Sequence, residues 1–249
     1  MIDIHAHILP GLDDGSPDME HSVEMAELAA ESGVTAIIAT PHCNQRGVFE
    51  NYASPELAER LETFRTELRE NGTPLEVYMG AEVYGAGNTA RLFREGRLAT
   101  LGGSRYLLTE FDFFADIGYM QWLINELLDA GCIPVIAHPE RYFELQEQPR
   151  IIEKWLADGL GIQINKGSLF GRFGSPAAKL AHYLLREGMV TCVASDAHGT
   201  RVRTTDMSPA MDFLSMEYSD GLAQLLLVDN PKRILQDREL VLPYEFEMF

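Results

Sequence analysis

The chain has 249 residues, of which 46% are hydrophobic, and its 20 Lys and Arg against 38 Asp and Glu give a formal charge of −18. This composition suits one globular domain or two small ones. The acidic charge argues against a surface that binds nucleic acid or an anionic bilayer. The longest apolar runs, such as 225–228, are far shorter than the roughly 20 residues that a membrane-spanning helix needs.

The first residues, Met-Ile-Asp-Ile-His, include neither a basic nor an apolar leader segment. We therefore expect no secretory signal and a cytoplasmic location. Cys43, Cys132 and Cys192 are expected to be free, buried thiols, because their spacing matches no compact thiolate metal site.

Short apolar runs that are rich in β-branched and aromatic residues alternate with helical segments along the chain. These runs predict strands at 2–4, 34–39, 75–79, 106–108, 133–137, 161–164 and 190–194. Most are continuously apolar, which is typical of parallel strands buried on both faces. Seven such strands indicate a closed or nearly closed α/β barrel in a single domain, residues 1–249, with an irregular tail over about 237–249.

Ser-Pro pairs and glycines mark the expected ends of the helices between these strands. Serines 16, 54, 175 and 208 each precede a proline and are predicted as N-caps. Glycines 33, 72, 131, 159 and 188 follow the helical segments and are predicted to end them.

Every predicted strand is followed by a side chain that can bind a metal. These residues are His5 and His7, His42, Glu82, Glu110, His138, Asn165, and Asp196 with His198. Because the carboxyl ends of barrel strands share one face, we expect them to form one pocket. Imidazoles and carboxylates without thiolates favour Zn, Mn, Fe or Mg, and their number indicates two or three ions and hydrolytic chemistry at phosphorus. His21 and His182 lie in helical segments and are expected to be ordinary surface or packing residues.

The ordered motifs resemble the polymerase-and-histidinol-phosphatase (PHP) superfamily, and most closely its bacterial metal-dependent protein-tyrosine phosphatase branch, which occurs with capsule and exopolysaccharide operons. The resemblance spans residues 1–198. The motifs read His5-Ala-His7-Ile-Leu-Pro-Gly-Leu-Asp-Asp14-Gly, Ala-Thr-Pro-His42, Gly-Ala-Glu82, Glu110-Phe, His138-Pro-Glu-Arg141-Tyr and Ser-Asp196-Ala-His198.

The resemblance implies a distorted (β/α)7 TIM-like barrel, the PHP fold, with a site for two or three divalent ions, first of all Mn²⁺, with Fe, Co, Zn or Mg as alternatives. It implies a first ion at His5 and His7, a second at Glu110 and His138, and Glu82 as the bridge between them. It assigns the third ion to Asp14 and His42, and it completes the cluster with Asp196 and His198. Asp14 is preferred to Asp13 because the family's acidic ligand directly precedes a glycine.

Two arginines are implied as phosphate-binding residues. Arg141 follows the His138 motif, and in the segment Gly-Thr-Arg201-Val-Arg203, which departs from the family pattern, Arg203 is preferred to Arg201. The implied reaction is attack on phosphorus by a metal-bridged hydroxide, with Asp196 or His198 supplying a proton to the leaving phenolate. A cysteine mechanism is excluded, because no cysteine is followed by arginine in the Cys-x5-Arg spacing that such enzymes need.

The implied substrate is a phosphotyrosine protein, namely the tyrosine-rich tail of a cognate kinase that regulates capsule or exopolysaccharide synthesis. Neither nucleic-acid binding nor direct membrane insertion is expected. Three alternatives differ in substrate or class: another PHP phosphoesterase such as a histidinol-phosphate phosphatase, an amidohydrolase-type metal hydrolase, and a non-catalytic scaffold. The segment Gly85-Ala-Gly87-Asn-Thr-Ala90 matches a dinucleotide fingerprint, but we interpret it as a loop at the rim of the pocket.

Overall fold

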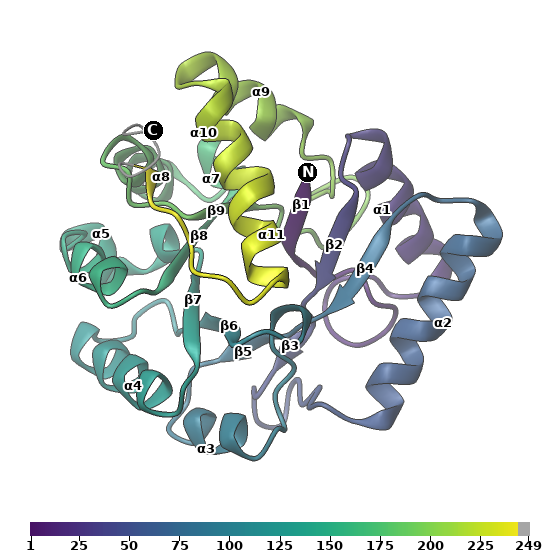
Figure 1. Ribbon diagram of the computed structural model, residues 1–249, viewed down its shortest axis with the longest axis horizontal. Helices are drawn as coiled ribbons and strands as arrows, with labels where there is room; N and C mark the ends of the chain where they lie inside the picture. Colours follow the sequence, from purple (N-terminus) through teal and green to yellow (C-terminus); the bar gives the residue numbers. More distant parts are fainter. Residues whose placement is uncertain (244–249) are drawn as a thin grey trace.

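The computed structural model describes residues 1–243, and its parallel strands are surrounded by helices (Figure 1). The strands are β1 (Ile2–Ala6), β2 (Ala36–Ala39), β3 (His42–Cys43), β4 (Glu76–Met79), β5 (Glu82–Tyr84), β6 (Tyr106–Glu110), β7 (Ile133–Ala137), β8 (Gly161–Asn165) and β9 (Cys192–Ala194). All the predicted strands are present, and the α/β class with parallel strands is confirmed.

Two predicted strands continue beyond a break into short strands that were not predicted. Pro41 separates β2 from β3, since proline has no N–H to donate to a neighbouring strand. The pairing nevertheless persists across the break, because the Gly80 N–H donates to the Ala39 carbonyl at 2.8 Å and the Glu82 N–H to the Pro41 carbonyl at 3.1 Å. His42 and Glu82 are therefore register partners in β3 and β5.

The strands form two hydrogen-bonded sets, β1-β2-β4 and β3-β5-β6-β7-β8-β9. The first strand meets the last just beyond the end of β9, where Ala6 bridges Ala197 in parallel. There the Asp196 N–H donates to the His5 carbonyl at 2.8 Å, and the His7 N–H donates to the Ala197 carbonyl at 2.9 Å. Residues almost 200 positions apart are thereby joined at the carboxyl end of the strands.

Helices α1 and α2 lie beside β2 and β4, and α4 to α6 lie on the opposite side of the molecule (Figure 1). The helices are α1 (Met19–Glu31), α2 (Pro55–Asn71), α3 (Thr89–Arg94), α4 (Ile117–Asp129), α5 (Phe143–Glu147), α6 (Ile151–Ala157), α7 (Lys166–Leu169), α8 (Ser175–Arg186), α9 (Ser208–Glu217), α10 (Asp220–Gln224) and α11 (Asn230–Leu235), with short helical segments η1 (Leu101–Gly103), η2 (Pro139–Arg141) and η3 (Leu225–Asp229).

Only one of the four predicted serine caps is confirmed. Ser54 caps α2 by accepting from the Leu57 N–H. The cap of α1 is Asp18, not Ser16, because the carboxylate two residues later accepts from the His21 N–H. Ser175 and Ser208 are already the first residues of α8 and α9, so neither acts as a cap. The predicted glycine end of α2 is confirmed, since Gly72 has a φ of 73°.

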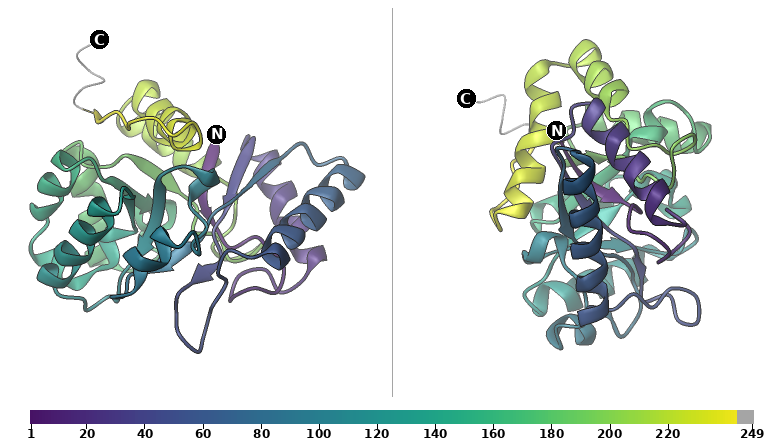
Figure 2. Two further views of the ribbon diagram at one scale, coloured as in Figure 1. Left: turned by 60° about the horizontal axis from the view of Figure 1, so that its bottom comes forward. Right: turned by 90° about the vertical axis from the view of Figure 1, so that its right-hand side faces the viewer.

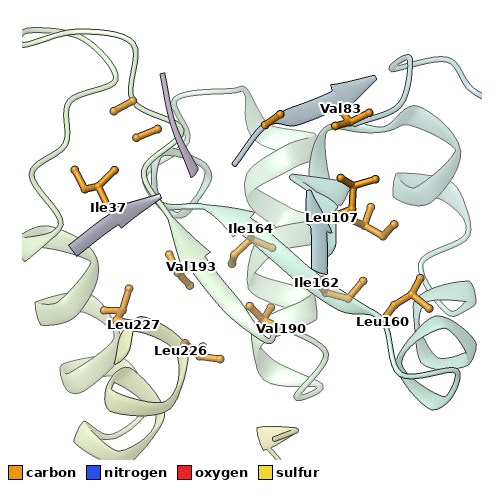
Figure 3. Close-up of a cluster of buried hydrophobic side chains, with 14 of the residues drawn as sticks. Ile37, Val83, Leu107, Leu160, Ile162, Ile164, Val190, Val193, Leu226 and Leu227 are labelled. Atoms are coloured by element: carbon orange, nitrogen blue, oxygen red, sulfur yellow. The ribbon is translucent and has the colours of Figure 1, made fainter. Parts of the chain in front are cut away.

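Apolar side chains fill the space between the strands and the helices. Val193 of β9 and Ile162 and Ile164 of β8 belong to one cluster with Leu226 and Leu227 of η3 (Figure 3). A second cluster contains β1 residues and Ile234 of α11. The C-terminal helices, shown in yellow-green in Figure 2, thus cover the amino ends of the strands, near the start of the chain.

The predicted tail packs against this end as far as it is described. The Arg105 N–H donates to the Asp237 carboxylate at 2.9 Å, and the Tyr106 hydroxyl donates to the Arg238 carbonyl at 2.8 Å. The rest of the predicted tail, 244–249, lies outside the described residues.

All three cysteines are buried and free, as expected. Burial raises the pKa of the Cys43 and Cys192 thiols to about 12, which makes thiolate chemistry at these positions unfavourable. None of the helices in residues 1–243 combines the length and apolarity that crossing a bilayer requires.

Candidate metal centre

The nine residues predicted as metal ligands come together at the carboxyl ends of the strands. They form four overlapping groups, in each of which one donor atom per residue lies within 4.8 Å of the others. The groups are His7, Asp14, His42 and His198; His5, His7 and Asp196; His5, Glu82 and His138; and His42, Glu82 and Glu110. Because the groups share members, they form one continuous cluster of imidazoles and carboxylates.

His5 of β1 and His7, which directly follows this strand, direct ring nitrogens at the same point. The His5 Nδ1 lies 2.9 Å from the Gln163 Oε1, which can only accept, so Nδ1 carries the proton. The His7 Nδ1 likewise donates to Asp13 at 2.7 Å. The two Nε2 atoms face each other at 3.2 Å, and in singly protonated rings both are lone-pair acceptors. Such a contact is repulsive unless a cation lies between the nitrogens, so this pair is suited to holding a metal.

Glu82 occupies the middle of the cluster. Its Oε2 lies 3.4 Å from the His5 Nε2, 3.2 Å from the His7 Nε2 and 3.0 Å from the His42 Nδ1. Its Oε1 lies 2.8 Å from the His138 Nε2. A carboxylate with histidines on both oxygens is placed to bridge two cations.

The charges of the buried acids in the cluster are strongly coupled. Burial alone would raise the pKa of Glu82, but the surrounding histidines outweigh it and hold that pKa well below its usual range. Burial together with the Glu82 charge raises the pKa of Glu110 to about 8. Glu82 and Glu110 lie in one group of donor atoms, and two acids at such a distance cannot both ionise readily without positive charge between them.

The adjacent acids Asp13 and Asp14 have different surroundings. The Asp13 side chain is 1% exposed, and it accepts from the His7 ring, from the His42 N–H at 2.9 Å and from the Gly15 N–H at 3.0 Å. The Asp14 side chain is 58% exposed, and its Oδ1 lies 3.4 Å from the Nε2 atoms of both His42 and His198. Asp13 therefore orients His7, whereas Asp14 belongs to one of the four groups of possible metal-binding atoms.

Gly15 allows this acidic segment to approach β1. A Cβ at this position would lie 2.2 Å from the His7 carbonyl oxygen, so any other residue would push the segment away. The close approach also lets the Ser16 N–H donate to that carbonyl at 3.0 Å. The glycine next to Asp14 is thus required by contact distance.

Both predicted phosphate-binding arginines reach Asp196. The Arg141 Nη1 lies 3.4 Å from the Asp196 Oδ2, and its guanidinium carbon lies 4.5 Å from the ring centres of both Phe113 and Phe173. Arg203 donates through Nε to the Asp196 carbonyl at 3.0 Å and through Nη2 to its carboxylate. Arg201 is exposed to solvent, so the geometry favours Arg203 as the second arginine.

Three residues at the site have left-handed backbone conformations that are rare for side chains other than glycine. The φ angles are 36° for His138, 50° for Asp196 and 51° for Arg203. Such conformations are unfavourable in free chains and persist where the surrounding structure enforces them, often at functional sites. Here they lie beyond the carboxyl ends of β7 and β9.

Several residues that support the cluster were not predicted from the sequence. Gln163 holds His5, and its amide donates to the Asn165 Oδ1 at 2.9 Å. A weak signal was present, because residues 163 and 165 are the polar members of an alternating strand and point to one side. Phe113 and Phe173, which enclose Arg141, lie in loops and gave no periodic signal.

The glycine-rich segment after β5 lies at the rim of a cavity of about 430 Å³, as expected. Ala86 lines this cavity together with Glu110 and Phe113. His21 and His182 are not members of the donor groups found in residues 1–243.

Comparison with known proteins identifies relatives along almost the whole chain. The family described as capsular polysaccharide synthesis, CpsB/CapC, matches residues 1–236. The tyrosine-protein phosphatase YwqE of Bacillus subtilis is 35% identical over 96% of this chain and 93% of its own length. The tyrosine-protein phosphatase CpsB of Streptococcus pneumoniae is 32% identical over 96% of this chain and 99% of its own length.

A solved structure agrees with these relatives. It belongs to the crystal structures of YwqE from Bacillus subtilis and CpsB from Streptococcus pneumoniae, which are described as metal-dependent tyrosine phosphatases. It superposes with a TM-score of 0.89 at 35% identity, and the match covers 97% of both chains.

Proposed function

Because the chain belongs to the CpsB/CapC family of capsular polysaccharide synthesis, we propose that it is a metal-dependent protein-tyrosine phosphatase. The observation that carries this proposal is the cluster of nine imidazole and carboxylate side chains around Glu82, beside two arginines. The names of the relatives, which are 35% and 32% identical over nearly full length, support the same activity.

The donor set fits two or three divalent ions. His5, His7 and Asp196 would hold one ion, Glu110 and His138 another with Glu82 between them, and Asp14, His42 and His198 a third. Three dications bring +6 against −4 from the carboxylates of Asp14, Glu82, Glu110 and Asp196, which leaves a site suited to a phosphate dianion. Imidazole and carboxylate donors accept Mn, Fe, Co, Zn or Mg, and Mn²⁺ is our first candidate. The ions would supply an activated water and neutralise charge on the phosphoryl group.

The arginines would orient the phosphoryl group and stabilise its charge in the transition state. Arg141 packs on the rings of Phe113 and Phe173, so its planar guanidinium can bind two phosphoryl oxygens without first becoming ordered. Arg203 approaches the same carboxylate from the segment that follows β9. Asp196 thus connects the metal ligands to both arginines.

Neither proposed proton donor retains a proton easily at neutral pH. Although burial favours its neutral form, His5, His138 and Arg203 hold the pKa of Asp196 below its usual range. Burial and the neighbouring His7 lower the pKa of His198. These directions favour Asp196 and His198 as ligands and orienting groups. A phenolate with a pKa of about 10 is a good enough leaving group to take its proton from water.

Architecture and cellular context complete the proposal. We take the two strand sets, joined through β1 and β9, as a distorted (β/α)7 barrel that forms one domain over residues 1–249. The proposed substrate is a phosphotyrosine protein in the cytoplasm, namely the tyrosine-rich tail of a kinase that regulates capsule or exopolysaccharide synthesis.

Elemental analysis and phosphatase assays on the same preparation test the proposal. We expect two to three divalent ions per chain, loss of p-nitrophenyl phosphate turnover after chelation, and recovery with Mn²⁺. A phosphotyrosine peptide should be hydrolysed faster than histidinol phosphate. Full turnover by metal-free protein, or a preference for histidinol phosphate, would contradict the proposal.

A further inference from the structure

A small cavity of about 140 Å³ lies beside the proposed catalytic site, between the segments that follow β8 and β9. Its lining includes Lys166, Arg172, Phe173, Arg203 and Asp206, and we name it the basic pocket. Two of these residues also belong to the catalytic site: Arg203 contacts Asp196, and Phe173 packs on Arg141. The basic pocket therefore adjoins the place where the phosphoryl group would be held.

The basic pocket contains more positive than negative charge. Three of these residues are cationic and one is acidic, and the Asp206 carboxylate already accepts from the Ser208 N–H at 2.9 Å and from its hydroxyl at 2.6 Å. Arg203 pairs with Asp196 and is assigned above to the phosphoryl group, which leaves Lys166 and Arg172 as the cations available to a second anion.

Within residues 1–243 neither available cation forms an ion pair with a carboxylate, although the charges of Asp3 and Asp206 act on Lys166. The Lys166 side chain is buried, and its ammonium donates to the Asp206 backbone carbonyl. Burial lowers the pKa of Lys166 to about 8, although the charges of Asp3 and Asp206 oppose the shift. Arg172 is exposed at the rim and forms no ion pair with this part of the chain. An anion bound between them would replace lost hydration with direct contacts.

The size of the basic pocket limits the ligand. Sites for drug-sized molecules have volumes of about 300–1,000 Å³, so this cavity suits a small side-chain group and not a nucleotide. In an extended peptide each residue advances about 3.3 Å, so a side chain one or two positions from the phosphotyrosine lies within roughly 7 Å along the chain. That distance suits a pocket that shares lining residues with the catalytic site.

We propose that the basic pocket binds the carboxylate of an Asp or Glu within two positions of the phosphotyrosine, so that this phosphatase prefers phosphotyrosines with an acidic neighbour. The inference rests on the proposed function and adds a specificity-determining site to it. It also gives the strongly acidic chain a local means of binding an acidic peptide.

Kinetics with matched phosphotyrosine peptides test this inference on the metal-loaded protein. Four peptides each carry a single Asp in an alanine background. The Asp lies two positions before the phosphotyrosine, one before, one after or two after. In at least one of these four peptides, the Asp should raise kcat/KM by roughly two- to fivefold over the value for the all-alanine peptide at low salt, through a lower KM. Arg172→Glu should abolish this gain.

Two controls distinguish an effect of the basic pocket from an effect on catalysis and from an effect of the protein's overall charge. Lys179→Glu introduces the same charge change at an exposed position of α8 outside the pocket, and it should keep the gain. The kcat for p-nitrophenyl phosphate should be unchanged in both variants. An absent gain at all four positions, or a gain that survives in Arg172→Glu, overturns the basic pocket while leaving the phosphatase intact. Failure to hydrolyse p-nitrophenyl phosphate and the alanine peptide would instead overturn the proposed function.

Discussion

Asp14 is much more exposed than the ligands around it, with 58% of its side chain open to solvent against 12% for His42 and 10% for His198. Its interaction with His198 is the largest cause that holds the pKa of Asp14 below its usual value, so the carboxylate is ionised and able to bind a cation at neutral pH. An ion held by this group would be the one most accessible to solvent and substrate.

Separate substitutions of the two neighbouring acids should have different effects on metal content. Asp14→Ala should lower the metal content by about one ion per chain, because it removes a donor from one group and leaves the groups around Glu82 intact. Asp13→Asn should keep the number of ions but weaken their binding by roughly ten- to a hundredfold, since it weakens the acceptor that orients His7. Metal titration followed by elemental analysis distinguishes the two variants. Loss of an ion in Asp13→Asn alone would show that Asp13, and not Asp14, binds the ion.

At the scale of the elements, Glu140 connects η2 to the next strand and helix. Its Oε1 accepts from the Asn165 N–H at the end of β8 at 2.9 Å and from the Ser168 hydroxyl of α7 at 2.6 Å. The side chain is fully buried, and burial raises its pKa to about 7. The connection fixes the start of the segment that carries Arg141.

The raised pKa of Glu140 predicts a pH-dependent stability. In the unfolded chain this carboxyl ionises near its ordinary pKa of about 4.5, before it does so in the folded protein. The free energy of unfolding should therefore fall as pH rises from about 4.5 to about 7, by roughly 3 kcal/mol from this group, and then level off. Glu140→Gln should lose this part of the dependence while keeping an acceptor for Asn165.

Urea denaturation of both proteins at pH 5 and pH 8, at equal metal content, measures this effect. The loss of stability between the two pH values should be smaller in Glu140→Gln. An equal loss in both proteins would show that Glu140 is ionised in the folded state throughout this range.

The sequence predicted where the strands lie and which side chains gather beyond their ends, since buried parallel strands are continuously apolar and each of these side chains follows a predicted strand. It did not predict β3 and β5, because two- and three-residue strands carry no periodic signal and one of them comes after a proline. It also placed caps at Ser16, Ser175 and Ser208, whereas Asp18 caps α1 and the other two serines are the first residues of their helices. Supporting contacts such as Gln163 with His5 depend on which strands are neighbours, and this information is not local.

At the scale of the whole molecule, the chain has a formal charge of −18, whereas its proposed site binds an anion. The overall field slows the approach of a small aryl phosphate, and salt reduces the range of that field from about 30 Å at 0.01 M to about 8 Å at 0.15 M. We therefore expect kcat/KM for p-nitrophenyl phosphate to rise about two- to fivefold over this range, with little change in kcat. A flat or falling response would contradict this expectation, and a neutral solute at matched osmolarity is the control.

The junction of β1 with the segment after β9 has a consequence for how the protein is made. The first strand leaves the ribosome early, but its partners at Asp196 and Ala197 are synthesised almost 200 residues later. A partly synthesised chain thus carries His5 and His7 without the acid that completes their donor group. Tight capture of metal ions should begin only after roughly four-fifths of the polypeptide has been translated, and contacts this distant in sequence are expected to make folding slow.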